Sequence, residues 1–414
     1  MQNRFTEDPE IRSHGPLYAA EAKKVLKEDL EHVCIENIQA CILVGNICLG
    51  DSDPDAESLY FVLANRMAQI LNLGTLLEAD DGVTRETKLR LWWTCFIIDT
   101  WSSGGSNLSR QFKLQAVQPR VPMDESTFFQ LKPGDPDVNI TEWKPGLWGY
   151  MVKLVEIYAQ IQDLNKYLAE TLEWDEDTIE DAVRGLAVML EAFEQSLRPE
   201  IKYSVENLAE HVSRGQGRTF IAFHLGYHHY YTLLFYQYLD RHRPPTRNGK
   251  AYADRCKLHA SIFCDILRAS REQGGAEALY NIVGHITVVS SSVLLHTYLF
   301  GEADELPDIR RRLESNLESL VQLRNYWSSV ELMINRLVVF QNSCMRSLGN
   351  NTHRFDRWMV KFLLEHAVAL DEKEDYLSYS WQESTASLPL GSTHLERSRV
   401  TQSIIADMQN FESG

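Results

Sequence analysis

Basic clusters are missing from this sequence of 414 residues. It has 41 lysines and arginines against 58 aspartates and glutamates, which gives a formal net charge of −17 at pH 7. Binding to nucleic acid relies on clustered basic side chains, which displace the counterions of the phosphates. The composition therefore predicts that the chain makes no direct contact with nucleic acid.

Signals for secretion and for a disulfide framework are also missing. The first ten residues, MQNRFTEDPE, are polar and charged, and no apolar core follows a basic start. The seven cysteines are an odd number, and Cys34, Cys41 and Cys48 recur every seventh residue, which places them on one face of a helix. We expect reduced cysteines in a core, and a cytosolic or nuclear compartment.

No alternating strand pattern of useful length is present, and helical spacing dominates from end to end. Two apolar stripes illustrate it: Leu59, Val62, Leu63, Met67 and Ile70, and then Leu313, Leu317, Leu320, Trp327, Ile334 and Val338. Asp53-Pro54 is typical of a helix start, and Gly74 of the end of the same helix. The patterns predict an all-α fold, with a single large helical domain over residues 1–370 and a polar tail over 371–414.

Charge is absent from two long stretches, Thr219 to Leu239 and Ala278 to Gly301. In a chain with 24% charged residues, such stretches need surroundings that exclude water on almost every side. Both contain several polar residues and neither has the basic cytoplasmic flank of a membrane span, so we expect buried central helices and no membrane span. An unpaired buried polar group costs about 1 to 3 kcal/mol, which favours a central pocket for a ligand.

Side chains before and along the first stretch are candidates for a binding site. Arg214 and Arg218 flank two glycines just before a helix N-terminus, where backbone N–H groups favour an anion such as diphosphate. A solvated loop that happens to hold two arginines is the alternative. One face of the helix that follows carries His224, Tyr227, Tyr231, Phe235 and Tyr238. Core packing and the lining of a cavity for an apolar substrate are the two explanations of this aromatic face.

Further polar residues on the two stretches have the spacing of ligands or of core partners. His224 and His228 stand at i and i+4, but no third ligand for a transition metal accompanies them. The second stretch carries a polar stripe at i, i+4, i+11 and i+15, which consists of Asn281, His285, Ser292 and His296. Mutual hydrogen bonds in a core explain such a stripe, and so does contact with a ligand.

The segment LRLWWTCFIID, from Leu89 to Asp99, resembles part of the middle homology region of fungal zinc-cluster transcription factors. The run ESLYFVLANRMAQILNLG before it, and the runs LLHTYLFGE and LRNYWSSVELMINRL after it, resemble the same region in the same order. The resemblance covers most of Asp55 to Leu370 and implies an all-helical regulatory fold. The family's DNA-binding element, six cysteines around two zinc ions, has no counterpart in this sequence.

In general character the chain is also similar to the unconventional fungal α-humulene synthases of tropolone meroterpenoid pathways. The likeness lies in an all-helical chain of this size, without a zinc cluster and with an aromatic, charge-free centre. It implies a sesquiterpene cyclase that converts farnesyl diphosphate to a macrocyclic hydrocarbon such as α-humulene. Mg²⁺ would assist departure of the diphosphate, and a dry aromatic cavity would stabilise the carbocations.

The Mg²⁺ ligands that this resemblance implies are Asp99, Ser103 and Asn107. Their four-and-four spacing resembles the metal motif of class I terpene cyclases. The pattern departs from that motif in its third residue, which is Asn, and in Gly104-Gly105, which interrupts the helix. Asp99 is also a typical residue of the transcription-factor block.

Two functions from different classes therefore compete. The preferred one is a lyase that acts on a prenyl diphosphate in the cytoplasm, with a homodimer left open. Its expected catalytic residues are His224, His228, Tyr231 and His285, and its expected substrate-binding residues are Arg214, Arg218, Tyr227, Phe235, Asn281 and Ser292. The alternative is a nuclear regulatory domain whose pocket binds an inducer, with DNA contact supplied by another chain.

Overall fold

The computed structural model describes residues 14–75, 77, 79–112, 118–139, 141–171, 175–240, 243–346, 354–373, 397 and 399–406. These residues form helices and no strand, and Met123 and Pro145 form an isolated antiparallel bridge. The all-α prediction is confirmed. The chain divides into two compact units, Met1–Val152 and Lys153–Gly414. A single domain over residues 1–370 stays a prediction.

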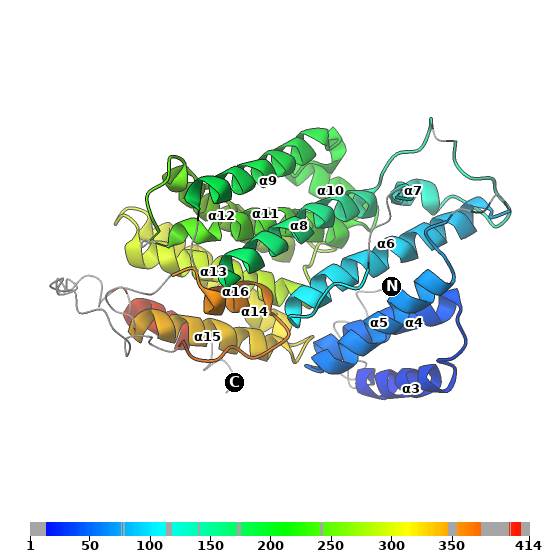
Figure 1. Ribbon diagram of the computed structural model, residues 1–414, viewed down its shortest axis with the longest axis horizontal. Helices are drawn as coiled ribbons and strands as arrows, with labels where there is room; N and C mark the ends of the chain where they lie inside the picture. The colour runs from blue at the N-terminus through cyan, green and yellow to red at the C-terminus, as the bar shows by residue number, and fades with distance from the viewer. Residues whose placement is uncertain are drawn as a thin grey trace. The chain divides into compact units, whose positions relative to one another are not determined.

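Helices account for most of both units (Figure 1). The first unit contains α3 (Gly15–Glu28), α4 (Ile35–Gly50), α5 (Pro54–Ile70), α6 (Gly82–Gly105), the short α7 (Glu125–Phe128) and the start of α8 (Leu147–Glu170). The second contains α9 (Glu176–Ser196), η1 (Pro199–Ile201), α10 (Val205–Ser213), α11 (Gly217–Phe235), η2 (Tyr236–Leu239), α12 (Gly249–Glu272), α13 (Ile282–Phe300), α14 (Leu306–Arg324), α15 (Val330–Arg346) and α16 (Arg357–Leu364). Residues 399–406 are also helical.

Helix α5 begins as predicted and ends earlier than predicted. The Asp53 carboxylate accepts a hydrogen bond from the backbone N–H of Ala56, and Pro54 is the first helical residue. The helix stops at Ile70 because Asn72 adopts a left-handed conformation with φ of 51°. The N–H of Leu73 then bonds the carbonyl of Ala68, the long hydrogen bond of a Schellman ending. Asn72 thus has the role predicted for Gly74.

The apolar stripe predicted as the buried face of α5 is largely outside the core. Leu59 is 60% exposed and Ile70 is 61% exposed, whereas Met67 of the same stripe is buried. The buried face consists instead of Tyr60, Phe61, Ala64, Met67 and Ala68. Helix α4 approaches this face closely at Gly45, where a Cβ atom would collide with the ring of Phe61. The interlocking of α4 with α5 therefore determined which face of α5 was buried.

One acid on the buried side of α5 has no basic partner to compensate its charge. Glu57 is 1% exposed, and its carboxyl accepts a hydrogen bond from Ser102 of α6. Burial raises the pKa of Glu57 to about 7, since water no longer solvates the charged form. The neutral form is therefore the one that suits the interface between α5 and α6.

The pKa of Glu57 predicts that this unit loses stability as pH rises from about 4.5 to about 7. The stabilising effect of the protonated carboxyl is complete below the unfolded pKa of 4.5 and is lost as pH rises through about 7. The full cost is about 3 kcal/mol. Glu57→Gln should remove this pH dependence when unfolding free energies are measured between pH 5 and 9, whereas the exposed Glu31→Gln should not. An unchanged pH profile in Glu57→Gln would contradict the assignment.

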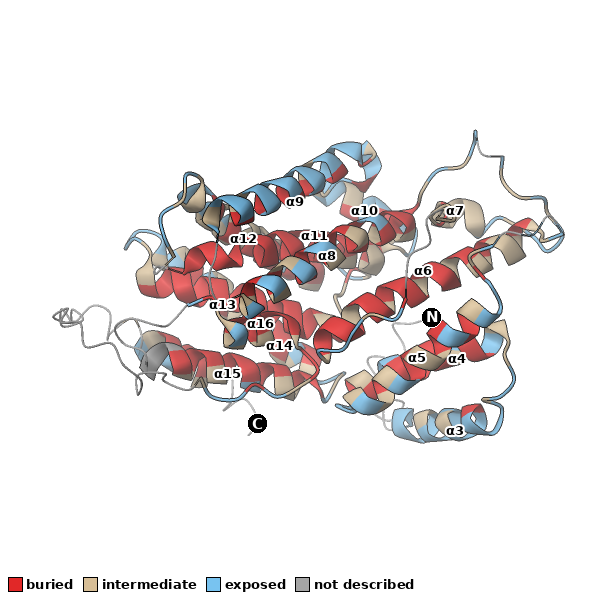
Figure 2. Ribbon diagram, viewed as in Figure 1, coloured by how far each residue is buried: buried red, intermediate tan, exposed pale blue. Residues whose placement is uncertain are grey.

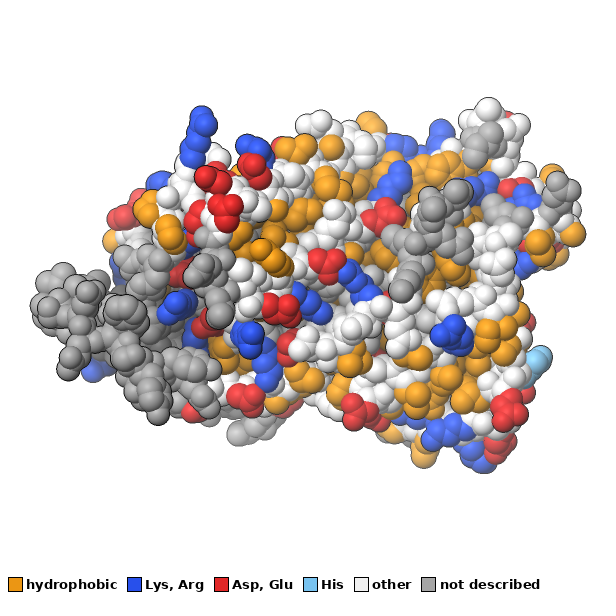
Figure 3. Space-filling model, viewed as in Figure 1, with side chains coloured by type: hydrophobic (Ala, Val, Ile, Leu, Met, Phe, Trp, Pro, Cys, Tyr) orange, Lys and Arg blue, Asp and Glu red, His pale blue; other side chains and the backbone are white. Residues whose placement is uncertain are grey.

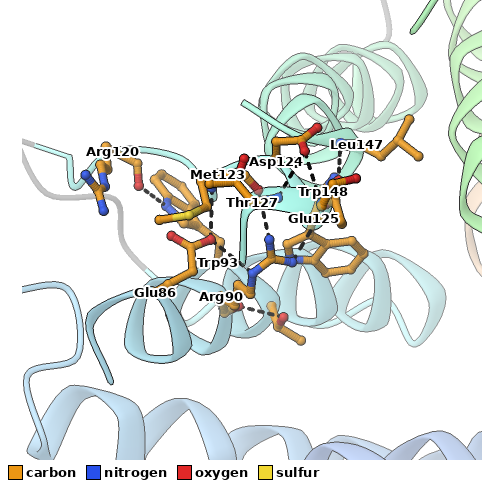
Figure 4. A network of polar contacts seen from close by, with 12 residues as sticks. Glu86, Arg90, Trp93, Arg120, Met123, Asp124, Glu125, Thr127, Leu147 and Trp148 are labelled. Carbon is orange, nitrogen blue, oxygen red and sulfur yellow. Dashed lines mark hydrogen bonds and ion pairs between the residues drawn. The ribbon is translucent and has the colours of Figure 1, made fainter. Parts of the chain in front are cut away.

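A buried ion pair fastens the Pro-rich segment, residues 118–146, to α6 (Figure 4). Glu86 is fully buried and accepts hydrogen bonds from Arg90 Nε, at 3.0 Å, and from the N–H of Met123, at 2.9 Å. Arg90 also donates to the carbonyl of Met123, at 2.8 Å, and lies 4.6 Å from the centre of the Phe128 ring. Trp93 Nε1 donates to the carbonyl of Arg120. Arg90 and Trp93 of α6 thus anchor this segment.

Loss of one partner of this ion pair should destabilise the protein strongly. In Glu86→Ala the guanidinium of Arg90 and the N–H of Met123 both lose an acceptor inside the protein. Breaking a fully buried pair costs about 3 to 5 kcal/mol, and we expect the lower end here because Arg90 is partly exposed and keeps Glu125 at 3.7 Å. Chemical denaturation should show that loss, while Glu142→Ala on the exposed part of the same segment should change stability by less than about 0.5 kcal/mol. Equal effects of the two variants would disprove the anchoring role.

The two charge-free stretches form the buried centre of the second unit. Figure 2 shows α11 and α13 as buried along nearly their whole length, whereas much of α9 is exposed. Helix α12 contacts both α11 and α13. Among the described residues α13 has the length and hydropathy of a membrane span, yet 94% of its apolar window is buried inside the protein. The prediction of buried central helices is confirmed.

The long stripe predicted around Trp327 is divided between two helices. Helix α14 ends at Arg324 and α15 begins at Val330. Trp327 lies between them, and its indole Nε1 donates to the carbonyl of Leu279, at 2.7 Å.

Charged side chains of both signs are interspersed on the face seen in Figure 3, and exposed pairs such as Arg310 with Glu314 contribute no more than about 1 kcal/mol each.

Candidate functional site

Three imidazoles and one guanidinium meet inside the second unit, in what we call the histidine–arginine centre. It consists of His229 of α11, His285 of α13, Arg336 of α15 and His366, which follows α16. The ring of His285 lies 5.0 Å from that of His366 and 6.0 Å from that of His229, measured between centroids. All four side chains are buried. The centre joins segments that are up to 137 residues apart in the chain, from 229 to 366.

Arg336 brings a positive charge into this centre and holds it with backbone carbonyls. Its Nη1 donates to Val368 O at 2.5 Å, and its Nη2 donates to the carbonyls of Lys361, at 2.7 Å, and Phe362, at 3.1 Å. Lys361 and Phe362 lie in the last turn of α16, where the helix dipole favours a cation. Burial lowers the pKa of Arg336 to about 10, so the guanidinium stays charged at neutral pH.

The histidines of the centre are neutral at physiological pH. Burial lowers the pKa of His229 to about 3 and that of His366 to about 4. It also lowers the pKa of His285 well below its usual value. His285 Nε2 donates to the carbonyl of Leu363, at 3.0 Å, which leaves Nδ1 as the acceptor nitrogen of this ring. Arg336 is therefore the charged member of the centre.

The buried polar atoms of the centre without a hydrogen-bond partner in the described residues include Nδ1 of His285, which can accept, and Nε of Arg336, which can donate. Oδ1 of Asn281, one turn before His285 on α13, is another such atom. Each of these atoms costs free energy while it is buried and unpaired. A small molecule with one donor and one acceptor would match the first two.

The predicted polar stripe of α13 divides between different partners. The Asn281 amide donates to Ser329 Oγ, and His285 belongs to the histidine–arginine centre. Ser292 Oγ instead shares a hydrogen bond of 2.8 Å with Tyr236 OH. His296 lies with its ring 5.0 Å from that of Phe300. Mutual bonding within the core thus accounts for Ser292, and contact with a ligand stays a prediction for His285.

The aromatic face of α11 is stacked against α9, α12 and the segment before α10. His224 donates to the carbonyl of Ile201, at 2.9 Å, and Tyr227 OH donates to Glu194, at 3.0 Å. His228 shares a hydrogen bond of 2.9 Å with His259. Tyr231 stacks on His259 and Phe235 stacks on Tyr252, with centroid distances of 4.0 and 5.0 Å. These contacts are the ones that the core-packing explanation predicts. Catalytic and substrate-binding roles for these residues stay predictions.

Both arginines of the predicted anion site are paired with carboxylates. Arg218, in the first turn of α11, donates through Nε and Nη2 to Glu277, at 3.0 and 2.9 Å. Arg214 makes an exposed i, i+4 pair with Glu210. The two guanidinium groups therefore have anionic partners within the protein, and binding of an external anion stays a prediction.

The predicted Mg²⁺ ligands lie in the first unit and act as structural groups. Asp99 is buried; its Oδ2 accepts from the N–H groups of Gln111 and Phe112, at 2.9 and 2.8 Å, and its Oδ1 accepts from Asn65. Ser103 donates to the carbonyl of Thr100. Asn107 lies beyond the end of α6, with a left-handed φ of 53°. The four-and-four spacing therefore does not persist along a helix.

Comparison with known proteins points to gene regulators. Residues 3–203 match the family model of the fungal specific transcription factor domain. A Zn(2)-C6 fungal-type transcription factor, FTF1c of Fusarium oxysporum f. sp. lycopersici, is 20% identical over 372 residues, which make up 80% of this chain and 40% of that protein. An uncharacterized transcriptional regulatory protein of Schizosaccharomyces pombe is 24% identical over 257 residues, 53% of this chain and 26% of its own length. These matches support a fungal transcription factor regulatory region. No solved structure matches.

The transcription factor relatives overturn the preferred prediction of an enzyme. They are regulators, so the lyase, its substrate farnesyl diphosphate and its product α-humulene were wrong. The Mg²⁺ prediction was wrong as well, since the described residues contain no group of three or more His, Cys, Asp or Glu side chains that could hold a metal ion. The cytoplasmic location was inferred for the enzyme and loses its support. This chain spans less than half the length of those relatives.

Three members of the histidine–arginine centre, which are His229, Arg336 and His366, were not identified from the sequence. His229 follows His228 directly and so points to another side of α11 than the aromatic face. Arg336 is a charged residue between the apolar positions Ile334 and Leu337, which was a visible signal. His366 has no such signal, because its place depends on how the chain returns after α16.

The neutral histidines predict loss of stability in acid. Their pKa values are near 6.5 in the unfolded chain and much lower in the folded one, so their stabilising effect is complete above 6.5 and is lost as pH falls below it. Each contributes a slope of about 1.4 kcal/mol per pH unit between pH 6 and 4. His229→Gln should reduce that slope in denaturation experiments, and the exposed His32→Gln should not. An equal slope in all three proteins would show that His229 is already protonated when folded.

Proposed function

We propose that this chain is the ligand-responsive regulatory region of a fungal transcription factor. The match of residues 3–203 to the fungal specific transcription factor domain is the observation that carries the proposal. Relatives named as Zn(2)-C6 transcription factors align with 80% or more of this chain. In this proposal the protein works in the nucleus, and a Zn(2)-C6 element outside these 414 residues contacts DNA. The acidic composition of the chain is consistent with DNA contact through a separate element.

The histidine–arginine centre supports the ligand-responsive part of the proposal. His285 Nδ1 requires a donor and Arg336 Nε requires an acceptor, so the ligand is a small neutral or anionic molecule that supplies both. His285 and Arg336 belong to α13 and α15, which contact each other. A ligand held by both side chains would stabilise one packing of these helices over another. Regulation would then follow from a shift in the population of that packing.

The regulatory role is tested by tethering the full chain to an unrelated DNA-binding domain in yeast. The measurement is the expression of a reporter gene downstream of the DNA site that this domain binds. We expect activation or repression relative to the DNA-binding domain alone. An unchanged reporter, with the fusion protein present in the nucleus, would contradict the role. A Mg²⁺-dependent hydrocarbon formed from farnesyl diphosphate by the purified chain would also contradict it.

The ligand is tested separately, by a thermal-shift screen of small carboxylic acids with the purified chain. A ligand at one hundred times its Kd adds about 2.7 kcal/mol of stability, which raises the Tm of a chain of 414 residues by about 3 °C. His285→Gln should abolish the shift, since it retains a donor for Leu363 O and removes the Nδ1 acceptor. Ser292→Ala on the same helix should keep it, because Ser292 bonds within the core. A shift that survives in His285→Gln would place the ligand elsewhere.

A further inference from the structure

The end of the chain returns to the second unit as a short helix. Residues 399–406 are helical, and residues 374–396, 23 residues in all, separate Lys373 from Arg397. In Figure 1 this last helix, coloured red, lies beside α15. We call Arg397 and residues 399–406 the terminal helix. The surface that it contacts, the C-terminal end of α13 together with α15 at Gln341, is called the docking surface.

The terminal helix contacts α13 through a guanidinium group, which donates hydrogen bonds to backbone carbonyls at the end of α13. Arg397 Nη1 donates to Gly301 O, at 2.9 Å, and to Leu299 O, at 3.4 Å. Both carbonyls lie at the C-terminal end of α13, where backbone acceptors lack helical partners and the dipole is negative. The α13 stretch has no charged residue of its own to place there. Arg397 therefore supplies from a distant segment the cation that a helix C-terminus favours.

Its contact with α15 is a buried hydrogen bond between two polar side chains. Thr401 is fully buried and its Oγ1 accepts from Gln341 Nε2, at 2.8 Å. Ile404 and Ile405 are buried at i+3 and i+4 from Thr401, on the same face, whereas Gln402 is exposed. The terminal helix is thus amphipathic, and a basic residue, a threonine and two isoleucines form its contact face.

The described part of the terminal helix spans residues 399–406, and a helical segment this short gains its stability from the surface it contacts. Isolated helices shorter than about 12 to 15 residues are marginal in water. The terminal helix is therefore ordered by binding, as a peptide ligand would be. Its covalent connection to the rest of the chain makes docking intramolecular, so a modest intrinsic affinity is enough to keep it docked.

We propose that the terminal helix is a tethered, displaceable ligand, and that the docking surface is a recognition site for amphipathic helices of this chemistry. The site is filled in cis by residues 397–406 of the same chain. It accepts the same segment in trans when the cis copy is released, which links two copies by exchange. This inference concerns a peptide site and does not depend on the proposed regulatory function.

The proposal is tested with the full chain and a fluorescent peptide of residues 395–408. Thr401→Glu places a charge in the buried contact and should release the terminal helix, which leaves the docking surface open. Fluorescence anisotropy should then show peptide binding at least about tenfold tighter than to the unsubstituted chain, whose site is filled in cis. Gln402→Glu, on the exposed side of the same helix, should bind the peptide as weakly as the unsubstituted chain does. A peptide with Arg397→Glu should bind neither.

Equal peptide affinity for the Thr401→Glu and Gln402→Glu chains would overturn the proposal, provided circular dichroism shows that both are folded. A second experiment avoids the substitution. A protease site inserted after Leu390 is cut in the folded full chain, and native mass spectrometry follows the released fragment. Reversible dissociation on dilution, with the remaining protein folded, is expected. A fragment that stays bound at nanomolar concentration, or whose loss unfolds the unit, would show that the terminal helix is a permanent part of the core.

Discussion

The burial of α11 and α13 along almost their whole length constrains the second unit more than any other feature. Their polar side chains leave water on folding, so they have to be neutral and find partners inside the protein. His224 bonds a carbonyl near η1, Tyr227 bonds a carboxylate of α9, and Ser292 bonds η2. Nδ1 of His285 and Nε of Arg336 are buried polar atoms without a partner in the described residues, and they are the atoms that the proposed ligand would bind.

Burial of ionisable side chains gives the stabilities of the two units opposite responses to pH. In the first unit burial favours the protonated, neutral form of Glu57, and stability falls as pH rises through about 7. In the second it favours the deprotonated, neutral form of His229 and His366, and stability falls as the medium becomes acid. Both effects follow from one cause, the cost of a charge away from water. Between about pH 4.5 and 6.5 the two effects oppose each other, and above about pH 7 neither of them changes the stability further.

The enzyme prediction, which the transcription factor relatives overturn, rested on an aromatic face interpreted as the lining of a cavity. An aromatic face on a charge-free helix has the same sequence whether it lines a void or stacks on other rings. Here Tyr231 and Phe235 stack on His259 and Tyr252, and Arg218 pairs with Glu277. The partner residues lie 17 to 59 positions away, a separation at which local spacing has no predictive value. The resemblance to transcription factors rested on the order of several motifs, and it proved the better guide.

The sequence by itself determined the helices and the depth at which they lie. Capping at Asp53, helical periodicity and the absence of charge over Thr219 to Leu239 act within a few turns, so local order suffices to predict them. Only the tertiary structure decided which face of α5 is buried, and it alone assembled the histidine–arginine centre. Those outcomes depend on steric fit between distant segments, such as Gly45 with Phe61, and on where the chain returns after α16. No local pattern encodes them, because the partners meet only after the helices have packed.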